Sequence, residues 1–532
     1  MGYSYINLDQ MNGLIQKMRG LHDRLPFIKG GLQDMLDQAG ATASLGQFDS
    51  AVTWAEEKML DLQKRYDLGV LAAGATTNLG NVTIDESLVP IISPEDLPKP
   101  DWGPDQVAGW WAGLTDAQKQ ALITSMPDVI GNLDGVDMAS RGQANELRLP
   151  GLITDAATKV AEAQAALAAA QTAATEASSK VGRGASSASK ESAVAAMEAN
   201  EKVTAAQDAL AKAQANYEDL TTLQAMETHG ITSQIPGAQS DPCMIVALDA
   251  SGYPVKAAVA VGDVDHAKNV VVMTPGMTST VRGAMPGYAE QADNICQLGA
   301  EETGSADTAA IVWLGYDAPD NLAQAASPSV AEAAAPHLAS FLDGFQASRI
   351  QPGAGGDPNL TAFGHSYGST VTGIAATLTQ PGTIDNLIIT GSPGSGVTNT
   401  SQYQVPPGRI FNSSAQPRLV VDEHGHVLVA QDGAVGLGQN ASIIAGATGP
   451  VFGIIAHEIT KGFGGDPKHM PGFTQLSNQT GPPVAPGNPS SEILQYFEKE
   501  VAGLHLTYTY VDGNGNPCPA MQDIVNVVTG QR

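Results

Sequence analysis

The sequence predicts an α/β fold for residues 240–532, with a doubly wound and mostly parallel sheet, preceded by an all-helical N-terminal region. Two observations support this prediction. After Gly230, short continuous apolar runs alternate with helix-compatible segments, which is typical of parallel strands covered by helices on both faces. Before it, residues 153–226 are rich in alanine and repeat their apolar positions at steps of three and four, which is typical of paired helices.

The size and charge of the chain limit its architecture and its partners. With 532 residues the chain is too long for one hydrophobic core, and about two to four domains are expected. Apolar residues make up 42% of the chain and charged residues 15%, as in globular proteins. The net charge of −28 argues against nucleic acid or an anionic membrane as a partner, because both bind clustered lysine and arginine.

The sequence carries no sign of a metal, a cofactor or a membrane span. Cys243, Cys296 and Cys518 lack the spacing of a metal site or a disulfide framework, although one disulfide remains open. We therefore expect no metal and no cofactor. We also expect no transmembrane helix, because no long uninterrupted apolar run occurs. Residues 1–20 lack the apolar core of a signal peptide, so we expect a cytoplasmic protein or export that depends on a folded helical signal.

The N-terminal region is predicted to be helical over residues 1–88. Apolar residues recur at steps of three and four from Met11 to Leu25, and Pro26 ends this amphipathic helix. Two further helices are expected at residues 28–38 and 50–71.

A linker and a Trp-anchored helical unit are expected over residues 89–150. Residues 89–104 are rich in proline and indicate a loop. Trp110 and Trp111 follow in a helix-turn-helix-like unit over residues 107–122. Such paired aromatic residues form either a packing anchor or a binding surface, and we favour the packing anchor.

An Ala-rich helical hairpin is expected over residues 151–230. From Val203 to Leu220, apolar and small residues alternate steps of three and four, a coiled-coil pattern that lets helices approach closely. Gly182 and Gly184 interrupt the pattern, which favours two helices folded back on each other over one rod. The hairpin either packs within the chain or serves as an arm for a helical protein partner or for self-association.

The α/β domain, residues 240–532, is expected to begin with a β-hairpin. Residues 244–249 and 255–261 are strand-like and are joined by a turn at residues 250–254. Four short apolar runs follow, separated by helix-compatible segments such as residues 327–345, and indicate buried parallel strands. These runs are residues 269–276, 308–316, 360–365 and 386–391.

The chemistry of the chain is organised around residues 364–368, which read G-x-S-x-G. A strand-like run precedes this motif and helix-compatible residues follow it, which is the context of a nucleophile elbow. In such an elbow a sharp turn lifts a serine hydroxyl above the end of a strand, and glycines leave room for the strained backbone. Ser366 is therefore the candidate nucleophile. The alternative is an ordinary tight turn between a strand and a helix.

An oxyanion hole for Ser366 needs two backbone donors. The N–H of Tyr367, directly after the serine, is one candidate. The second donor is expected in the loop after an earlier strand, here residues 274–278. We choose the N–H of Met277, because Gly276 lets the backbone come close to a ligand. The alternative is a Pro-Gly turn that only reverses the chain.

Serine hydrolysis also needs a base and an acid that orients it, and in this type of fold both follow the serine in the chain. His469, in a loop rich in glycine and proline, is the best-placed base. We take Asp422 as the acid. Residues 422–426 form the tip of a predicted hairpin, and the His-x-His pair there lacks a third ligand for a metal. The other downstream candidates are Glu423, His424, His426, Asp432, His457, Glu458, Asp466 and His505.

Six stretches of the chain follow one another in a specific order and together cover most of residues 107–137 and 255–397. In sequence and order they resemble an actinobacterial alpha/beta-hydrolase family, long described as a domain of unknown function. The stretches are WWAGLTDAQKQALITSMPDVIGNLDGV at 110–136, VAVGDVDHAKNVVVMTPGMTST at 259–280, IVWLGYDAPDN at 311–321, FLDGFQASR at 341–349, GHSYGSTVTG at 364–373 and TGSPGSGV at 390–397.

The resemblance implies an alpha/beta-hydrolase fold and a hydrolase activity whose substrate is not settled. Members often carry helical N-terminal regions similar to the WXG-type helical hairpins exported by type VII secretion. The stretch around Trp54 is loosely similar to these, which makes a type VII-like route the expected form of export.

Two positions depart from the family pattern. There, the acid follows the strand after the GSPG segment, and the histidine precedes a final helix, expected here at residues 490–503. Arg418 stands at about the first position and Pro483 at about the second, and neither side chain can serve as acid or base. We expect a serine hydrolase that acts on a small ester or acyl substrate. The alternative is a catalytically impaired alpha/beta-hydrolase fold that acts as a binding or assembly module.

Overall fold

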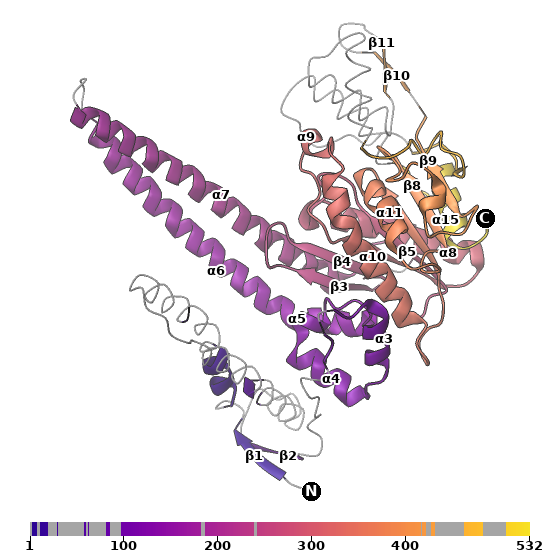
Figure 1. Cartoon of the computed structure of the whole chain (residues 1–532), viewed down its shortest axis with the longest axis horizontal. Helices are drawn as coiled ribbons and strands as arrows, with labels where there is room; N and C mark the ends of the chain where they lie inside the picture. The colour runs from indigo at the N-terminus through magenta and orange to yellow at the C-terminus, as the bar shows by residue number, and fades with distance from the viewer. Residues whose placement is uncertain are drawn as a thin grey trace. The chain divides into compact units, whose positions relative to one another are not determined.

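The computed structural model describes most of the α/β part of the chain and a smaller share of the N-terminal region (Figure 1). The chain divides into two compact units, residues 1–102 with 113–130, and residues 103–112 with 131–532. The described residues are 3–7, 11–19, 29, 58–59, 62, 81–85, 97–99, 101–181, 187–238, 242–416, 418–421, 427–430, 462–481 and 507–532.

The first unit contains a pair of strands that the sequence pattern does not indicate. β1 (Tyr3–Asn7) and β2 (Asn81–Asp85) pair in antiparallel fashion along their whole length. Each strand has five residues and its partner lies far along the chain, so local periodicity carries no sign of the pairing.

Most other described residues of the first unit are helical. The amphipathic helix expected from Met11 is present over residues 11–19, whereas those expected at 28–38 and 50–71 fall almost wholly outside the described residues. α4 (Asp116–Ser125) begins after Thr115, which forms a reciprocal capping box with Gln118. α5 (Pro127–Ile130) follows directly.

The second unit is built on an eight-stranded sheet, which confirms the predicted fold class. The strands lie in the order β12-β9-β8-β7-β5-β6-β4-β3, so the chain crosses over between β4, β5 and β6. Their bounds are β3 (Cys243–Asp249), β4 (Lys256–Val261), β5 (Asn269–Thr274), β6 (Thr308–Leu314), β7 (Asn359–His365), β8 (Asn386–Thr390), β9 (Ile410–Ser413) and β12 (Thr474–Gln475).

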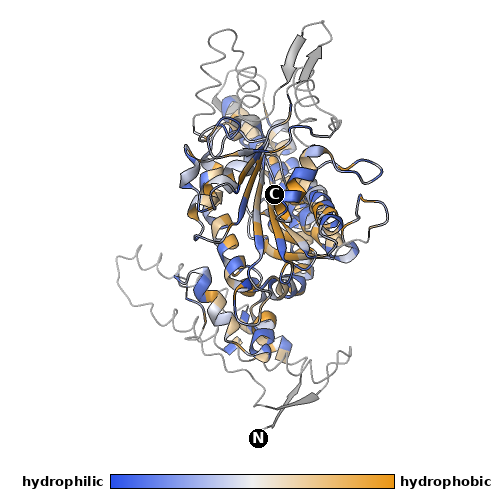
Figure 2. Cartoon of the chain, turned by 90° about the vertical axis from the view of Figure 1, so that its right-hand side faces the viewer, coloured by the Kyte–Doolittle hydropathy of each residue, from blue (hydrophilic) through white to orange (hydrophobic). Residues whose placement is uncertain are grey.

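Strand direction in the sheet is mostly parallel. β4 runs antiparallel to its neighbours β3 and β6, and the remaining neighbours pair in parallel. This arrangement is the alpha/beta-hydrolase fold. The parallel strands are continuous apolar runs because both faces are covered, and the sheet stands out as a hydrophobic layer between helices (Figure 2). A second hairpin, β10 (Arg418–Val421) with β11 (Val427–Ala430), lies outside this sheet, as expected from the pattern around residues 422–426.

Helices cover the sheet within the described ranges. α8 (Val281–Thr303) contacts α15 (Pro519–Val528), and α10 (Ser329–Arg349) contacts α11 (Tyr367–Leu378). α9 (Leu322–Ala325) precedes α10. Alternate residues of β7 point to opposite faces of the sheet, and their neighbours show that α8 lies on one face and α11 on the other. Phe363 and His365 line a pocket with Tyr288 of α8, whereas a side chain at Gly364 would meet Ser369 of α11.

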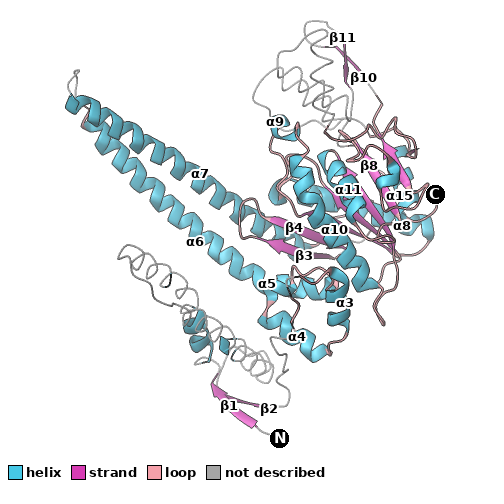
Figure 3. Cartoon of the chain, in the orientation of Figure 1, coloured by secondary structure: helices cyan, strands magenta, loops and turns pink. Residues whose placement is uncertain are grey.

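The expected helical hairpin is formed by α6 (Met138–Ser179) and α7 (Ser187–His229), which lie side by side (Figure 3). α6 begins at Met138, earlier than the pattern predicts. Pro150 lies inside the helix, and proline in a pattern normally marks a helix end. Asp137 caps the helix by accepting a hydrogen bond from the backbone N–H of Ser140.

Within the second unit, polar contacts attach the hairpin to β3 and to α8. On α6, the Asn145 amide donates to the carbonyl of Ile245 in β3. On α7, the buried carboxylate of Asp219 accepts hydrogen bonds from the backbone N–H and the guanidinium of Arg282, in the first turn of α8. The hairpin therefore holds the start of a helix of the hydrolase fold.

Trp111 and the three cysteines of the chain also lie in this unit. Trp111 of α3 (Pro104–Ala112) is buried and its indole N–H donates to Asp137 over 2.6 Å, in keeping with a packing anchor. Cys243, Cys296 and Cys518 are buried free thiols. None of the helices in the described ranges has the length and apolar character needed to cross a bilayer.

Candidate active site

The backbone at Ser366 has the strained geometry of a nucleophile elbow. Ser366 follows the last residue of β7 and precedes the first residue of α11, with φ of 57° and ψ of −131°. Its N–H donates to the carbonyl of Thr390 in β8 over 2.9 Å. Its own carbonyl accepts from the N–H and the hydroxyl of Ser369. These bonds hold a conformation that L residues seldom adopt.

Three glycines make the turn possible, because a side chain at each would collide with its neighbours. A Cβ at Gly364 would lie 2.5 Å from the Cα of Ser369, and one at Gly368 would lie 2.3 Å from the Thr274 carbonyl. A Cβ at Gly276 would lie 2.5 Å from the Cβ of Ser366. Gly276 thus brings the loop after β5 into direct contact with the elbow.

The loop after β5 is itself fixed by side chains from elsewhere in the fold. The Tyr316 hydroxyl donates to the carbonyl of Pro275 over 2.6 Å. The N–H of Thr278, which has a positive φ of 60°, donates to the carbonyl of Pro319 over 2.7 Å. Thr280 then caps α8 by accepting from the N–H of Gly283. We call residues 275–279 the oxyanion loop.

The two candidate oxyanion donors, Met277 and Tyr367, each lie one residue from the contact between Gly276 and Ser366. Met277 follows Gly276, whose Cα faces the serine side chain. Tyr367 is the first residue of α11, where backbone N–H groups have no acceptor within the helix. The phenol of Tyr367 donates to the carbonyl of Ser327 over 2.6 Å and accepts from the N–H of Ala331. This pair of bonds fixes the elbow against the start of α10.

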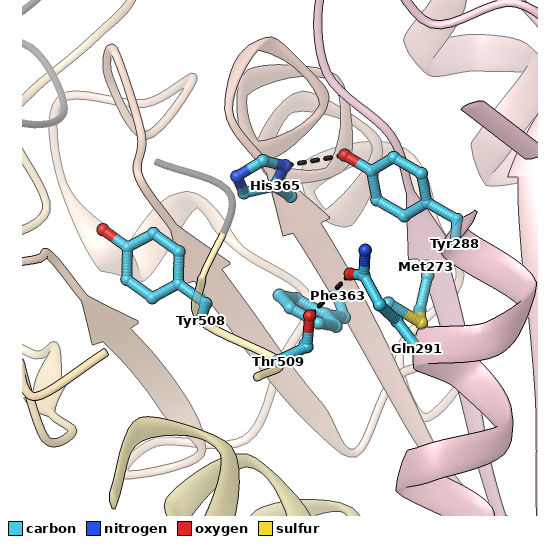
Figure 4. Close-up of a pocket in the computed structure, with 7 residues that line it drawn as sticks. All are labelled: Met273, Tyr288, Gln291, Phe363, His365, Tyr508 and Thr509. Carbon is cyan, nitrogen blue, oxygen red and sulfur yellow. Dashed lines mark hydrogen bonds between the residues drawn. The ribbon is translucent and has the colours of Figure 1, made fainter. Parts of the chain in front are cut away.

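His365 points to the other face of the sheet, into a small pocket (Figure 4). Its Nδ1 lies 2.7 Å from the hydroxyl of Tyr288 on α8. On the far side of the pocket, the Thr509 hydroxyl donates to Gln291, also on α8. The space between these residues is about the size of one water molecule. The pocket is therefore too small to bind an acyl substrate.

Tyr288 and Tyr316 are buried phenols that the sequence analysis did not identify. Burial raises the pKa of both phenols above the usual value for tyrosine. For Tyr288, the nearby backbone of Gly276 partly opposes this effect. Both phenols therefore stay protonated at neutral pH. No local pattern marks them, because their partners, His365 at the end of β7 and Pro275 after β5, lie far away in the sequence.

The structure does not bring a candidate base to Ser366 within the described ranges. There, the Ser366 hydroxyl takes part in no hydrogen bond. His469 lies in a turn, with its side chain 76% exposed and its Nε2 3.9 Å from a carboxylate oxygen of Asp466. Asp422 lies outside the described residues. The other downstream histidines, His424, His426, His457 and His505, lie outside them too.

The loop of His469 is nevertheless tied to the sheet edge near the elbow. The N–H of Ser395 donates to the carbonyl of Gly465 over 3.0 Å, and the N–H of Gly465 donates to the carbonyl of Val397 over 2.6 Å. Residues 395–397 follow β8, which is the neighbour of β7. His469 is therefore on a loop that packs against the segment beside the elbow.

Amide side chains meet beyond β9 and β12, on the segments that lead to Arg418 and Pro483. The Gln416 side chain donates to the Asn478 side chain over 3.0 Å. The Ser413 hydroxyl donates to the carbonyl of Ser477 over 2.6 Å. Arg418 begins β10, and Pro483 lies outside the described residues. The described strand ends thus carry amides and hydroxyls, which do not titrate near neutral pH.

Comparison with known proteins gives three results. A family model described as alpha/beta hydrolase matches residues 251–427. An uncharacterised protein of Mycobacterium tuberculosis is 34% identical over 251 residues, which cover 46% of this chain and 79% of the relative. A second uncharacterised protein of the same organism is 26% identical over 449 residues, which cover 76% of this chain and 61% of the relative.

Among solved structures, the chain is similar to two hydrolytic enzymes. A dienelactone hydrolase from Anabaena variabilis matches with a TM-score of 0.18 and 17% identity, over 26% of this chain and 59% of that one. An esterase from Pyrobaculum calidifontis matches with a TM-score of 0.20 and 13% identity, over 36% of this chain and 58% of that one. The match thus spans less than two thirds of either solved chain.

Proposed function

Because the chain belongs to the alpha/beta-hydrolase family, we propose that it is a serine hydrolase in which Ser366 attacks a small ester or related acyl substrate. The observation that carries the proposal is the positive φ of Ser366. A non-glycine residue in such a conformation costs about 1–3 kcal/mol. Glycine at this position would remove that cost. Serine there therefore favours a nucleophile over an ordinary tight turn.

In the proposed reaction the Ser366 oxygen forms a bond to the acyl carbon, and the carbonyl electrons move onto the acyl oxygen. The N–H groups of Met277 and Tyr367 stabilise that oxyanion, and the N-terminal end of α11 adds a favourable dipole. Collapse of the intermediate releases the alcohol with the serine proton and leaves an acyl-serine. Water then attacks the acyl-serine and releases the acid.

For the base we propose His469, with Asp422 as the acid that orients it. The support for His469 is its loop, which is hydrogen-bonded to residues 395–397 beside the elbow. The assignment requires His469 to turn from its exposed position near Asp466 toward the serine. Its test is His469→Ala. We expect ester turnover to fall by roughly 10⁴-fold. Turnover that survives the substitution removes His469 from the mechanism.

The nucleophile is tested by labelling the full chain with a fluorophosphonate probe and by following p-nitrophenyl acetate hydrolysis. We expect one probe per chain in the wild type and none in Ser366→Ala. The matched control is Ser178→Ala, an exposed serine on α6, which should label like the wild type. Equal labelling of the wild type and Ser366→Ala would reject the proposal.

A second candidate function is a binding module that keeps the fold without the reaction. The observation that favours it is the amide pair of Gln416 and Asn478 beyond β9 and β12, on the segments that lead to Arg418 and Pro483, the positions at which the resemblance implies the acid and the histidine. Amides cannot take a proton from serine at neutral pH. This candidate predicts a folded wild type that neither labels nor hydrolyses the ester. Labelling that depends on Ser366 decides against it.

A further inference from the structure

Asp219 of α7 is a buried carboxylate at the N-terminal end of α8, the helix that follows the oxyanion loop. We infer that Asp219 is a positioning residue, whose carboxylate fixes the start of α8 and with it the proposed oxyanion donor at Met277. This inference rests on the proposed function. It gives the helical hairpin a part in the reaction, which the motif around Ser366 does not indicate.

Three hydrogen bonds join Asp219 to a single residue of α8. Its Oδ1 accepts from the backbone N–H of Arg282 over 2.8 Å. Nη1 of the Arg282 guanidinium lies 3.1 Å from Oδ1 and 3.0 Å from Oδ2. The Asp219 side chain is fully buried, so bulk water does not compete strongly for these bonds. The carboxylate therefore fixes both the backbone and the side chain of Arg282.

The place of Arg282 in α8 explains why its backbone N–H needs this acceptor. It is the second residue of the helix, where a backbone N–H has no acceptor within the helix. Thr280 accepts from the next N–H, that of Gly283, so two side chains satisfy neighbouring donors of one helix end. The helix dipole also favours a negative charge there. Asp219 is therefore a second cap of α8, supplied by a helix far away in the sequence.

The position of Asp219 is set in turn by contacts of α7 with the turn between β3 and β4. Three residues earlier on α7, the Asn216 side chain donates to the carbonyl of Gly252 over 2.9 Å. A further four residues earlier, Nζ of Lys212 lies 5.9 Å from the centroid of the Tyr253 ring. Residues at such steps share one face of a helix. This face of α7 thus contacts both the edge of the sheet and the start of α8.

The oxyanion loop, residues 275–279, ends three residues before Arg282. Thr278 in this loop has a positive φ of 60°, a conformation that persists only where neighbouring contacts hold it. Its N–H donates to the carbonyl of Pro319 over 2.7 Å, and the capped start of α8 holds the chain that follows. Met277 directly precedes Thr278. A start of α8 that is free to move therefore lets the Met277 N–H leave the position of the acyl oxygen.

The substitution Asp219→Ala tests this role, because it removes all three hydrogen bonds to Arg282. A misplacement of about 1 Å at a reacting centre costs on the order of 10²-fold in rate. We therefore expect kcat for p-nitrophenyl acetate and the rate of fluorophosphonate labelling to fall by about 10- to 100-fold. KM should stay within about twofold of the wild type, because an oxyanion donor acts mainly on the charge that develops in the transition state.

Two other variants separate positioning from a general loss of stability. Arg282→Met keeps the backbone N–H that Asp219 accepts but leaves the buried carboxylate without its ion pair, so it should lose at least as much stability as Asp219→Ala. It should nevertheless label at least about threefold faster than Asp219→Ala. Asp343→Ala removes a carboxylate of α10 that accepts from the backbone N–H of Gln380, after α11, and should label at the wild-type rate. If Asp219→Ala labels as fast as either variant, the positioning role is rejected.

A second measurement does not depend on catalysis. In full-length protein labelled with ¹³C at the methionine methyl groups, the Met277 signal is identified by its loss in Met277→Leu. The Met277 side chain is half-buried against the core, so its signal reports a shift of the loop. We expect this signal to move in Asp219→Ala and to stay in Asp343→Ala. An unchanged Met277 signal in Asp219→Ala overturns the inference.

The methyl signal also separates failure of this inference from failure of the proposed function. If the wild type does not label, the serine hydrolase proposal falls, and the Met277 signal alone decides whether Asp219 fixes the oxyanion loop.

Asp219→Asn covers the case in which Asp219→Ala does not fold, as judged by circular dichroism. The amide has the shape of the carboxylate, but with one acceptor oxygen in place of two and no charge it binds Arg282 less firmly. This variant should label more slowly than Arg282→Met and should also move the Met277 signal. Labelling as fast as that of Arg282→Met, or an unmoved Met277 signal, overturns the inference.

Discussion

The contact between Gly276 and Ser366 leads to a quantitative prediction for Gly276→Ala. The added Cβ would lie 2.5 Å from the Ser366 Cβ and 2.8 Å from its hydroxyl oxygen. Ordinary carbon contacts are about 3.5–4.0 Å, so the two segments must separate by roughly 1 Å. The oxyanion loop and the elbow are the segments that move apart. The Met277 donor then moves away from the position of the acyl oxygen.

The expected loss of rate follows from this displacement. Removal of one oxyanion donor costs about 10²–10³-fold in kcat, and a 1 Å displacement costs about 10²-fold. We therefore expect fluorophosphonate labelling of Gly276→Ala to slow by at least about 100-fold. Overpacking of this kind costs about 1–3 kcal/mol of stability, which a domain of this size survives.

A matched variant separates the local collision from a general effect of adding a methyl group. Gly287→Ala changes a glycine inside α8 whose added Cβ would meet nothing within 4 Å. This variant should label at the wild-type rate and be more stable by up to about 1 kcal/mol, because alanine is the better helix former. Both proteins are compared by circular dichroism and by labelling rate. Gly276→Ala that labels as fast as Gly287→Ala would refute the assigned position of the oxyanion loop.

Two further predictions concern the helical hairpin. Burial and the neighbouring Glu146 raise the pKa of Glu227 from 4.5 to about 7, so the wild type loses stability as the pH rises through 7. The free energy of unfolding of Glu227→Gln is measured in urea. At pH 8 the variant should be more stable than the wild type by roughly 1–2 kcal/mol, after allowance for solvent screening, and below pH 4.5 the two should be equal. The control Glu201→Gln, at an exposed position, should show no such difference. If α7 is an arm for self-association, Met197, whose side chain is 67% exposed, is the residue to test. Light scattering at micromolar concentration should then show an oligomer for the wild type and a monomer for Met197→Glu. A monomeric wild type speaks against this use of the arm.

The elements that the sequence predicted well are those that carry their own signal. The strands β5 and β7 are short and largely apolar, and their observed bounds lie within two residues of the expected ones. The sequence predicts the elbow because its glycines avoid local collisions, and it indicates Met277 as a donor because Gly276 lets the backbone come close. A pattern that reports on adjacent residues is sufficient for such features.

Other elements depend on contacts that periodicity does not report. β12 has only two residues and exists through its pairing with β9, and β1 pairs with a strand far along the chain. The α15 helix was not predicted, although its apolar residues pack against α8 and the sheet. The hydrogen bonds of Tyr288 and Tyr316 form only when distant parts of the chain meet. His469 and Asp422 were chosen by chain order, and they remain predictions.

The bond from Asp219 to the first turn of α8 bears on how far this protein can be shortened. Arg282 lies only four residues after Thr278 of the oxyanion loop, and its backbone N–H is capped by a carboxylate that belongs to the hairpin. A protein trimmed to residues 240–532 would retain every residue of the elbow and yet lose this cap. A fragment that keeps the geometry of the oxyanion loop therefore has to begin before Asp219, and not at residue 240 as the composition suggests.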